Sequence, residues 1–205
     1  MPLLRKAGLM ALAFLALTFA GAMTARADVV VIGATNGNLA TAFVDCTLVN
    51  ASTFQFTITN TSPFAARITG VGFDLPNVAG LGNFAASGAV PAGFNFSTDL
   101  GNVPQFGSAV LNFGFTTGAD FAGGGGGGIA AGASATFTVT GNFGGLTEDQ
   151  ICNSIFVRFQ SVGATGQLSD VGVPGNNPVP EPVTMLLFGT GLAGVAAKVR
   201  RRRKA

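Results

Sequence analysis

The sequence predicts a mainly β fold, an antiparallel β-sandwich of the jelly-roll or immunoglobulin-like kind. Three observations favour this class. Short runs that alternate apolar and polar residues recur through the middle of the chain, and Gly, Asn and Pro separate them. Helix-length amphipathic patterns are scarce in the same region. Roughly seven to nine short strands in a segment of this length are typical of two packed antiparallel sheets.

The first strands are expected over Val29–Ile32 and Leu39–Thr47. The clearest strand is Thr53–Thr59, in which the even-numbered residues are aromatic or aliphatic and the odd-numbered residues are polar. One face of this strand should therefore be buried and the other exposed. The turn-forming residues Asn60–Pro63 follow it. Further strands are expected over Ala66–Leu75, Asn95–Leu100, Ala109–Phe115, Ala135–Asn142 and Ile151–Gln160.

Two other segments differ from this strand pattern. Leu146–Asn153 indicates a helical turn, with Thr147 as its N-cap and with Glu148 and Asp149 in its first turn. The glycine run Gly123–Gly128 is expected to be a mobile loop, because fixing consecutive glycines costs much conformational entropy. A phosphate-binding loop is not expected there, since neither Gly-Lys-Ser nor Gly-Lys-Thr follows the run.

The chain contains two cysteines, Cys46 and Cys152. An even number of cysteines in an exported protein suggests one disulfide. Cys46 stands at the end of an early strand and Cys152 at the start of the last one, so the bridge would join the two ends of the domain. Two separate buried thiols are the alternative. A catalytic cysteine is not expected, because the chain has no histidine to activate it.

Charge is distributed unevenly along the chain. The whole chain has a net charge of +2. Between Asp28 and Pro182, however, two basic residues, Arg67 and Arg158, stand against nine acidic ones, which gives this part a net charge of −7. An acidic surface repels phosphate backbones, so nucleic acid is not expected as a partner.

Several residue types that catalysis commonly uses are missing from the same part of the chain. It contains no His, Lys, Tyr or Trp, which excludes a Ser-His-Asp triad and a Ser-Lys dyad. We therefore expect no catalytic residue, no cofactor site and no metal site, and we do not expect an enzyme. Two alternatives stay open, a pair of carboxylates that hydrolyses glycosides and a calcium site in the loops. The candidates are Asp45, Asp74, Asp99 and Asp120 for hydrolysis, with Asp170 added for calcium.

The N-terminal segment is typical of a secretory signal peptide. Two basic residues near the start precede the apolar stretch Gly8–Ala22. Ala25 and Ala27 are small residues at the two positions that signal peptidase reads, so cleavage is expected before Asp28. An uncleaved membrane anchor is the alternative.

The C-terminal segment combines three features. Pro180, Glu181 and Pro182 precede the apolar run Val183–Val199, whose length is at the lower limit for a transmembrane helix. A basic tail follows, which by the positive-inside rule would stay in the cytoplasm. The tail consists of Arg200, Arg201, Arg202, Arg203 and Lys204.

This combination resembles the PEP-CTERM sorting signal of exopolysaccharide-producing Gram-negative bacteria. Pro180–Pro182 matches the motif after which the family is named, Val183–Val199 matches the transmembrane part, and the basic tail matches the basic end. The resemblance implies transient insertion into the inner membrane, and recognition and cleavage by exosortase, a membrane-embedded processing enzyme. It also implies delivery to the cell surface or to the extracellular matrix.

The signal peptide and the C-terminal sorting signal together define the predicted domain organisation of the chain. It consists of a signal peptide at 1–27, a β-sandwich ectodomain at 28–173, a linker with the Pro-Glu-Pro motif at 174–182, a transmembrane helix at 183–199 and a basic tail at 200–205. Signal peptidase and exosortase are the expected processing partners. Extracellular polysaccharide is a further expected partner of the ectodomain.

The predicted function is a structural or adhesive role in a biofilm or exopolysaccharide matrix. A carboxylate-dependent hydrolase of extracellular polysaccharide is one alternative. A membrane-anchored periplasmic binding protein, whose C-terminal segment is never removed, is the other.

Overall fold

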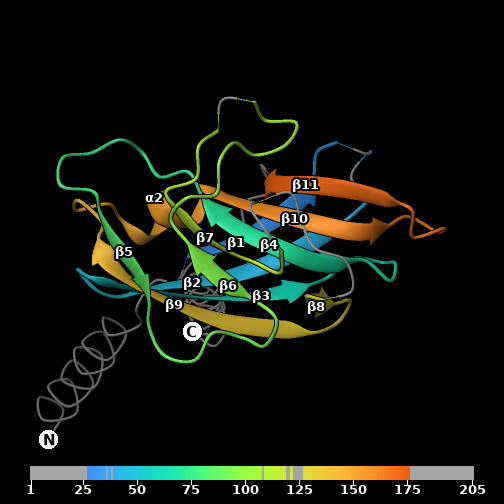
Figure 1. Ribbon diagram of the computed structural model, residues 1–205, viewed down its shortest axis with the longest axis horizontal. Coiled ribbons are helices and arrows are strands. Elements are labelled where there is room, and N and C mark those ends of the chain that lie inside the picture. Colours follow the sequence, from blue (N-terminus) through green and yellow to red (C-terminus); the bar gives the residue numbers. More distant parts are fainter. Residues whose placement is uncertain are drawn as a thin grey trace, which may run out of the picture. The chain divides into compact units, whose positions relative to one another are not determined.

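The computed structural model describes residues 27–35, 37, 39–107, 109–118, 121 and 127–175. All of them belong to one compact unit, Arg26–Val179, which Figure 1 shows as a ribbon. The chain up to residue 26 and from residue 176 onward lies outside this description, as does most of the glycine run. No helix in the part of the chain that the structure describes has the length and hydropathy needed to cross a membrane.

Strands make up most of the regular structure in these residues. They are β1 (Ala27–Gly33), β2 (Thr41–Asn50), β3 (Thr53–Asn60), β4 (Arg67–Phe73), β5 (Gly82–Ala86), β6 (Asn95–Ser97), β7 (Phe113–Thr116), β8 (Ile129–Ala130), β9 (Ser134–Asn142), β10 (Ile155–Val162) and β11 (Leu168–Pro174). A short helix, α2 (Glu148–Cys152), lies between β9 and β10. The predicted mainly β class is confirmed.

The strands form a single antiparallel sheet in the order β5-β9-β3-β2-β1-β11-β10-β4-β7-β6, and β8 pairs with β4. The predicted antiparallel sandwich is confirmed in part, with one continuous sheet in place of two. The two layers are halves of one sheet, because β1 pairs with β2 on one side and with β11 on the other. In Figure 1 the more distant β1 and β2 lie behind β4 and β7.

Phenylalanine rings join the two halves of the sheet. The ring of Phe56 on β3 lies 5.0 Å from that of Phe73 on β4, centroid to centroid. The ring of Phe137 on β9 lies 4.6 Å from that of Phe115 on β7. Because these strands are far apart in the sheet order, the sheet must fold over and bury one face. The edge strands β5 and β6 come into contact as well, so the fold approaches a closed barrel.

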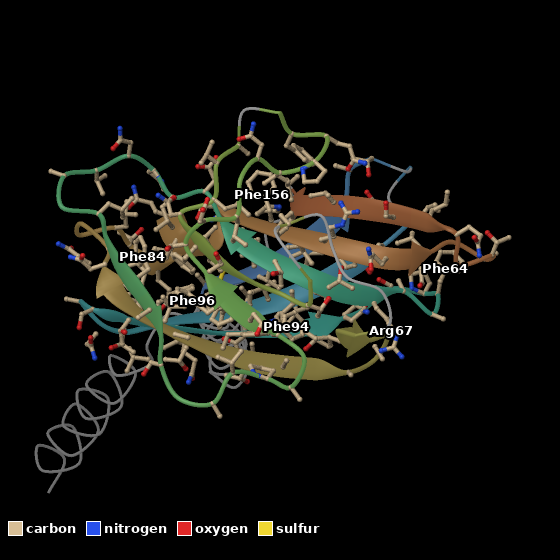
Figure 2. The ribbon with its side chains drawn as sticks, in the orientation of Figure 1. Phe64, Arg67, Phe84, Phe94, Phe96 and Phe156 are labelled. Atoms are coloured by element: carbon tan, nitrogen blue, oxygen red, sulfur yellow. A yellow bond between two sulfur atoms is a disulfide. The ribbon has the colours of Figure 1, made fainter. Side chains whose placement is uncertain are left out.

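A smaller apolar cluster lies on another face of the sheet, against β4, β10 and β11. It consists of Leu100, Val103, Ala109, Leu111, Phe121 and Val171, with the partly buried Phe106 and Phe156 (Figure 2). Gly70 and Gly72 of β4 make room for it, since a Cβ atom at Gly72 would lie 2.3 Å from Leu111. Residues 109–112 therefore cover the sheet, and the predicted strand over Ala109–Phe115 is confirmed only from Phe113 onward.

The remaining sequence predictions can be compared element by element. The strands expected at the start, over Thr53–Thr59, within Ala66–Leu75 and over Ala135–Asn142 are confirmed. The strand expected over Asn95–Leu100 ends at Ser97. The helical turn is confirmed, and the Thr147 hydroxyl accepts a hydrogen bond from the backbone N–H of Gln150. Because this helix extends to Cys152, the last predicted strand begins at Ile155 instead of Ile151. Strands β5, β8 and β11 were not predicted.

Candidate functional site

The predicted disulfide is present. Cys46 of β2 and Cys152 of α2 are bonded, with their Cα atoms 6.1 Å apart. Both side chains are fully buried. The alternative of two separate thiols is therefore wrong, and the bridge attaches α2 to the sheet across a sequence separation of 106 residues.

The carboxylate of Glu148 makes a second attachment between α2 and the sheet. Its Oε1 accepts a hydrogen bond from the backbone N–H of Ala27 at 2.7 Å, and its Oε2 accepts one from Leu48 at 2.6 Å. Ala27 begins β1 and Leu48 lies near the end of β2. The sequence indicated Glu148 only as a residue of a first helical turn. Its two partners could not be inferred, because they lie 121 and 100 positions away.

Hydroxyl and amide side chains cover the outer face of β3 and β9, which are neighbours in Figure 1. We call this surface the hydroxyl face. It consists of Thr53, Gln55, Thr57 and Thr59 on β3, and of Ser134, Thr136, Thr138 and Thr140 on β9. Three registered pairs bond across the strands through their side chains. The Oγ atoms of Thr57 and Thr136 are 2.8 Å apart, and Gln55 Nε2 donates to Thr138 Oγ1 at 3.2 Å.

The hydroxyl face is neutral and at least partly exposed to solvent. The residues that alternate with it are buried in the core, among them Phe54, Phe56 and Phe137. The two basic side chains that the structure describes, Arg67 (Figure 2) and Arg158, lie on β4 and β10, in the other half of the sheet. The surface therefore offers hydrogen-bond donors and acceptors, and Asp45 of β2, which is directly opposite Thr57, places a carboxylate at its border.

The candidate carboxylates are distributed over several elements. Asp45 lies on β2, Asp74 follows β4 and Asp99 follows β6, whereas Asp120 lies outside the residues that the structure describes. Burial raises the pKa of the Asp74 carboxyl above its ordinary value. Among the described residues, no three His, Cys, Asp or Glu side chains come together in a way that could hold a metal ion.

One carboxylate, that of Asp170 on β11, is fully buried. Its Oδ1 accepts hydrogen bonds from the backbone N–H of Thr35, at 2.9 Å, and from the Thr35 hydroxyl. Gly33 leaves space for this carboxylate, since a Cβ atom there would lie 2.0 Å from Oδ2. The contacts of Asp170 attach the loop after β1 to β11, which is a structural role.

The comparisons with known proteins concern the C-terminal segment. A family profile described as the PEP-CTERM protein-sorting motif matches residues 178–203. The chain carries a PEP-CTERM sorting motif. This match includes Pro180–Pro182, Val183–Val199 and the basic tail through Arg203. No curated protein and no solved structure matches the chain.

The PEP-CTERM motif indicates how the chain is handled in the cell. It implies export, a membrane-anchored precursor and exosortase-dependent sorting to the cell surface. The motif itself, the apolar run and the basic tail lie outside the described residues, as does Ala25. Ala27 and Asp28 are the first residues of β1. Cleavage by signal peptidase before Asp28 stays a prediction.

Proposed function

We propose that this protein is a non-enzymatic structural or adhesive component of an extracellular polysaccharide matrix. The PEP-CTERM motif supports delivery to the cell surface. The observation that carries the adhesive role is the registered pairing of the hydroxyl face on β3 and β9. Its cross-strand pairs repeat about every 6.8 Å along the strands, because residues on one face are two positions apart and each position adds about 3.4 Å. A sugar chain presents hydroxyl groups that can donate to and accept from such side chains.

The binding that this surface supports is weak for each sugar and stronger for a long polymer. A hydrogen bond formed in water replaces bonds to water, so each one contributes little. A polymer that contacts several of these pairs at once gains from effective concentration. We therefore expect retention by long polysaccharide chains and little competition from short oligosaccharides of the same sugars.

The test removes two paired hydroxyl groups together. The double variant Thr57→Val and Thr136→Val removes together two hydroxyl groups that bond to each other, and valine is as compatible with a strand as threonine. Affinity electrophoresis in gels that contain the exopolysaccharide of the producing cells measures retention. We expect binding to weaken roughly fivefold or more, because two hydrogen bonds contribute about 0.5–1.5 kcal/mol each.

Thr165→Val is the matched control, because Thr165 is an exposed threonine between β10 and β11. It should leave retention unchanged. Equal migration of wild type, double variant and control in the presence of the polymer would contradict a role of the hydroxyl face in adhesion.

The non-enzymatic part of the proposal has its own measurement. Polysaccharide incubated with the protein should keep its length in size-exclusion chromatography. Shortening of the polymer that Asp45→Asn, Asp74→Asn or Asp99→Asn abolishes would support a hydrolase instead.

A further inference from the structure

The predicted signal-peptide cut lies inside a strand of the folded domain. Ala27 is 8% exposed and pairs with Cys46 of β2, and Asp28 pairs with Asp45. A protease needs an accessible, extended segment, so cleavage between Ala27 and Asp28 must come before β1 joins the sheet. The domain would then fold from a chain that begins with the α-ammonium group of Asp28.

Removal of Ala27 changes the surroundings of Glu148. The N–H of Ala27 is the donor to Glu148 Oε1, at 2.7 Å, and cleavage removes it. The other oxygen of this half-buried carboxylate, Oε2, still accepts a hydrogen bond from the backbone N–H of Leu48. The Asp28 nitrogen stands one residue further, about 3.3 Å along the strand. As an ammonium group it carries a positive charge and three N–H donors, where the peptide had one neutral donor.

The start of β1 is also an acidic region. Asp28 and Asp45 stand directly opposite each other on β1 and β2, and like charges in this position destabilise a strand pair. Glu148 adds a third carboxylate.

We propose that the carboxylate of Glu148 binds the α-ammonium group that signal peptidase creates at Asp28. This ion pair takes the place of the hydrogen bond from Ala27. It holds the new N-terminus beside α2 and the Cys46–Cys152 disulfide. Removal of the signal peptide then contributes directly to the stability of the exported domain. The inference depends on export and on the cleavage position, and polysaccharide binding does not enter it.

Acetylation of the α-amine tests this ion pair. Asp28–Pro182 contains no lysine, so the reagent modifies the N-terminus and, where the C-terminal segment is retained, Lys198 and Lys204. Processed protein is purified after export, and its N-terminus is read by mass spectrometry. Urea unfolding of the native and acetylated forms is then followed by circular dichroism for the wild type and for Glu148→Gln.

We expect acetylation to lower the folding equilibrium constant of the wild type roughly threefold to thirtyfold, and to have much less effect in Glu148→Gln. The double-mutant cycle isolates the coupling between ammonium and carboxylate, and it cancels any contribution of Lys198 and Lys204. Asp149→Asn is the matched control, because it removes an exposed charge from the same helical turn. It should respond to acetylation as the wild type does.

A second measurement needs no variant. The α-amine of the folded wild type should react with the acetylating reagent at least about tenfold more slowly than in urea, since an ion-paired, hydrogen-bonded amine is a poor nucleophile. Equal responses of wild type and Glu148→Gln to acetylation would overturn the proposal. A mature chain that begins at a residue other than Asp28 would also overturn it.

Discussion

At the residue scale, Gly33 and Asp170 occupy adjoining space between β1 and β11. The missing side chain at Gly33 leaves room for a carboxylate that has none of its surface in contact with water. Thr35 supplies two hydrogen-bond donors to Asp170. A buried carboxylate is tolerated only with such partners, so these three residues must be considered as a unit.

Gly33→Ala should destabilise the domain by about 1–3 kcal/mol, the usual cost of forcing extra volume into a packed site. The new Cβ would lie 2.0 Å from Asp170 Oδ2, and either the carboxylate or β1 must move. The measurement is the urea midpoint. Gly107→Ala is the control, since a Cβ at Gly107 meets nothing within 4 Å. Equal midpoints for both variants would contradict this account.

Asp74 gives a pH-dependent prediction. Burial raises the pKa of its carboxyl in the folded state, so the folded state binds the proton more tightly than the unfolded state does. As the pH rises through this raised pKa, Asp74 ionises in its partly buried position, and the free energy of unfolding therefore decreases. Asp74→Asn should have a higher urea midpoint than the wild type at pH 7. The difference should disappear below the ordinary pKa of aspartate, about 3.9. A difference that stays constant between these pH values would argue against burial as its cause.

At the element scale, the disulfide and α2 join the early strands to the late ones. The Cys46–Cys152 bridge stands next to the start of β1, because Cys46 pairs with Ala27 in the sheet. The capping box of Thr147 and Gln150 fixes the first turn of α2. This helix is short, so these attachments stabilise it more than its own backbone hydrogen bonds can.

The double variant Cys46→Ala and Cys152→Ala should lose about 4–5 kcal/mol of unfolding free energy, which the chain-entropy model gives for a loop of this length. Alanine avoids placing a free thiol or a hydroxyl in the buried site. Thermal unfolding with and without the bridge measures the loss. Wild type kept reduced during unfolding should have a midpoint close to that of the variant, and an unchanged midpoint in both would contradict the prediction.

The elements that the sequence predicted well have regular alternation. Thr53–Asn60 is the clearest case, because every second residue from Phe54 to Asn60 is fully buried. Strand β11 escaped prediction for the opposite reason. Its buried positions include Asp170 and Gly172, so a charge and a glycine stand where apolar residues would be expected. Strand β5 is short and contains Gly82 and Asn83, both with positive φ.

The candidate site was predictable in part. The outward-facing threonines of β3 follow from alternation within one segment, and the disulfide follows from the number of cysteines. The pairing of β3 with β9 does not follow, because it joins Thr57 to a residue 79 positions away. The carboxylate contacts of Glu148 and Asp170 depend on the same kind of distant neighbour.

At the scale of the whole molecule, the sheet closes on itself almost completely. Its edge strands are β5 and β6, which contact each other, and β6 is only three residues long. The pairing of β5 with β9 also shifts register between Gly82 and Ala85. Short and irregular edges do not offer a good template for further strands.

Processing of the C-terminus also belongs to this scale. Replacing Pro180, Glu181 and Pro182 by alanine should prevent removal of the C-terminal segment, because the PEP-CTERM motif implies recognition by exosortase. Cell fractionation and the intact mass of the purified protein measure this. The precursor should accumulate in the membrane at full C-terminal length.

Alanine substitution of Asn176 and Asn177 is the control, because it changes the sequence just before the motif and leaves the motif itself intact. It should leave processing unchanged. Normal removal of the segment from the triple-alanine variant would show that Pro180–Pro182 is not required.

The central position of β11 has a mechanical consequence. β11 is the last strand that the structure describes, and it is hydrogen-bonded to β1 on one side and to β10 on the other. Tension applied along the axis of β11 loads both ladders in shear, so their hydrogen bonds resist together. A tail attached to an edge strand would instead peel one ladder open, one bond after another.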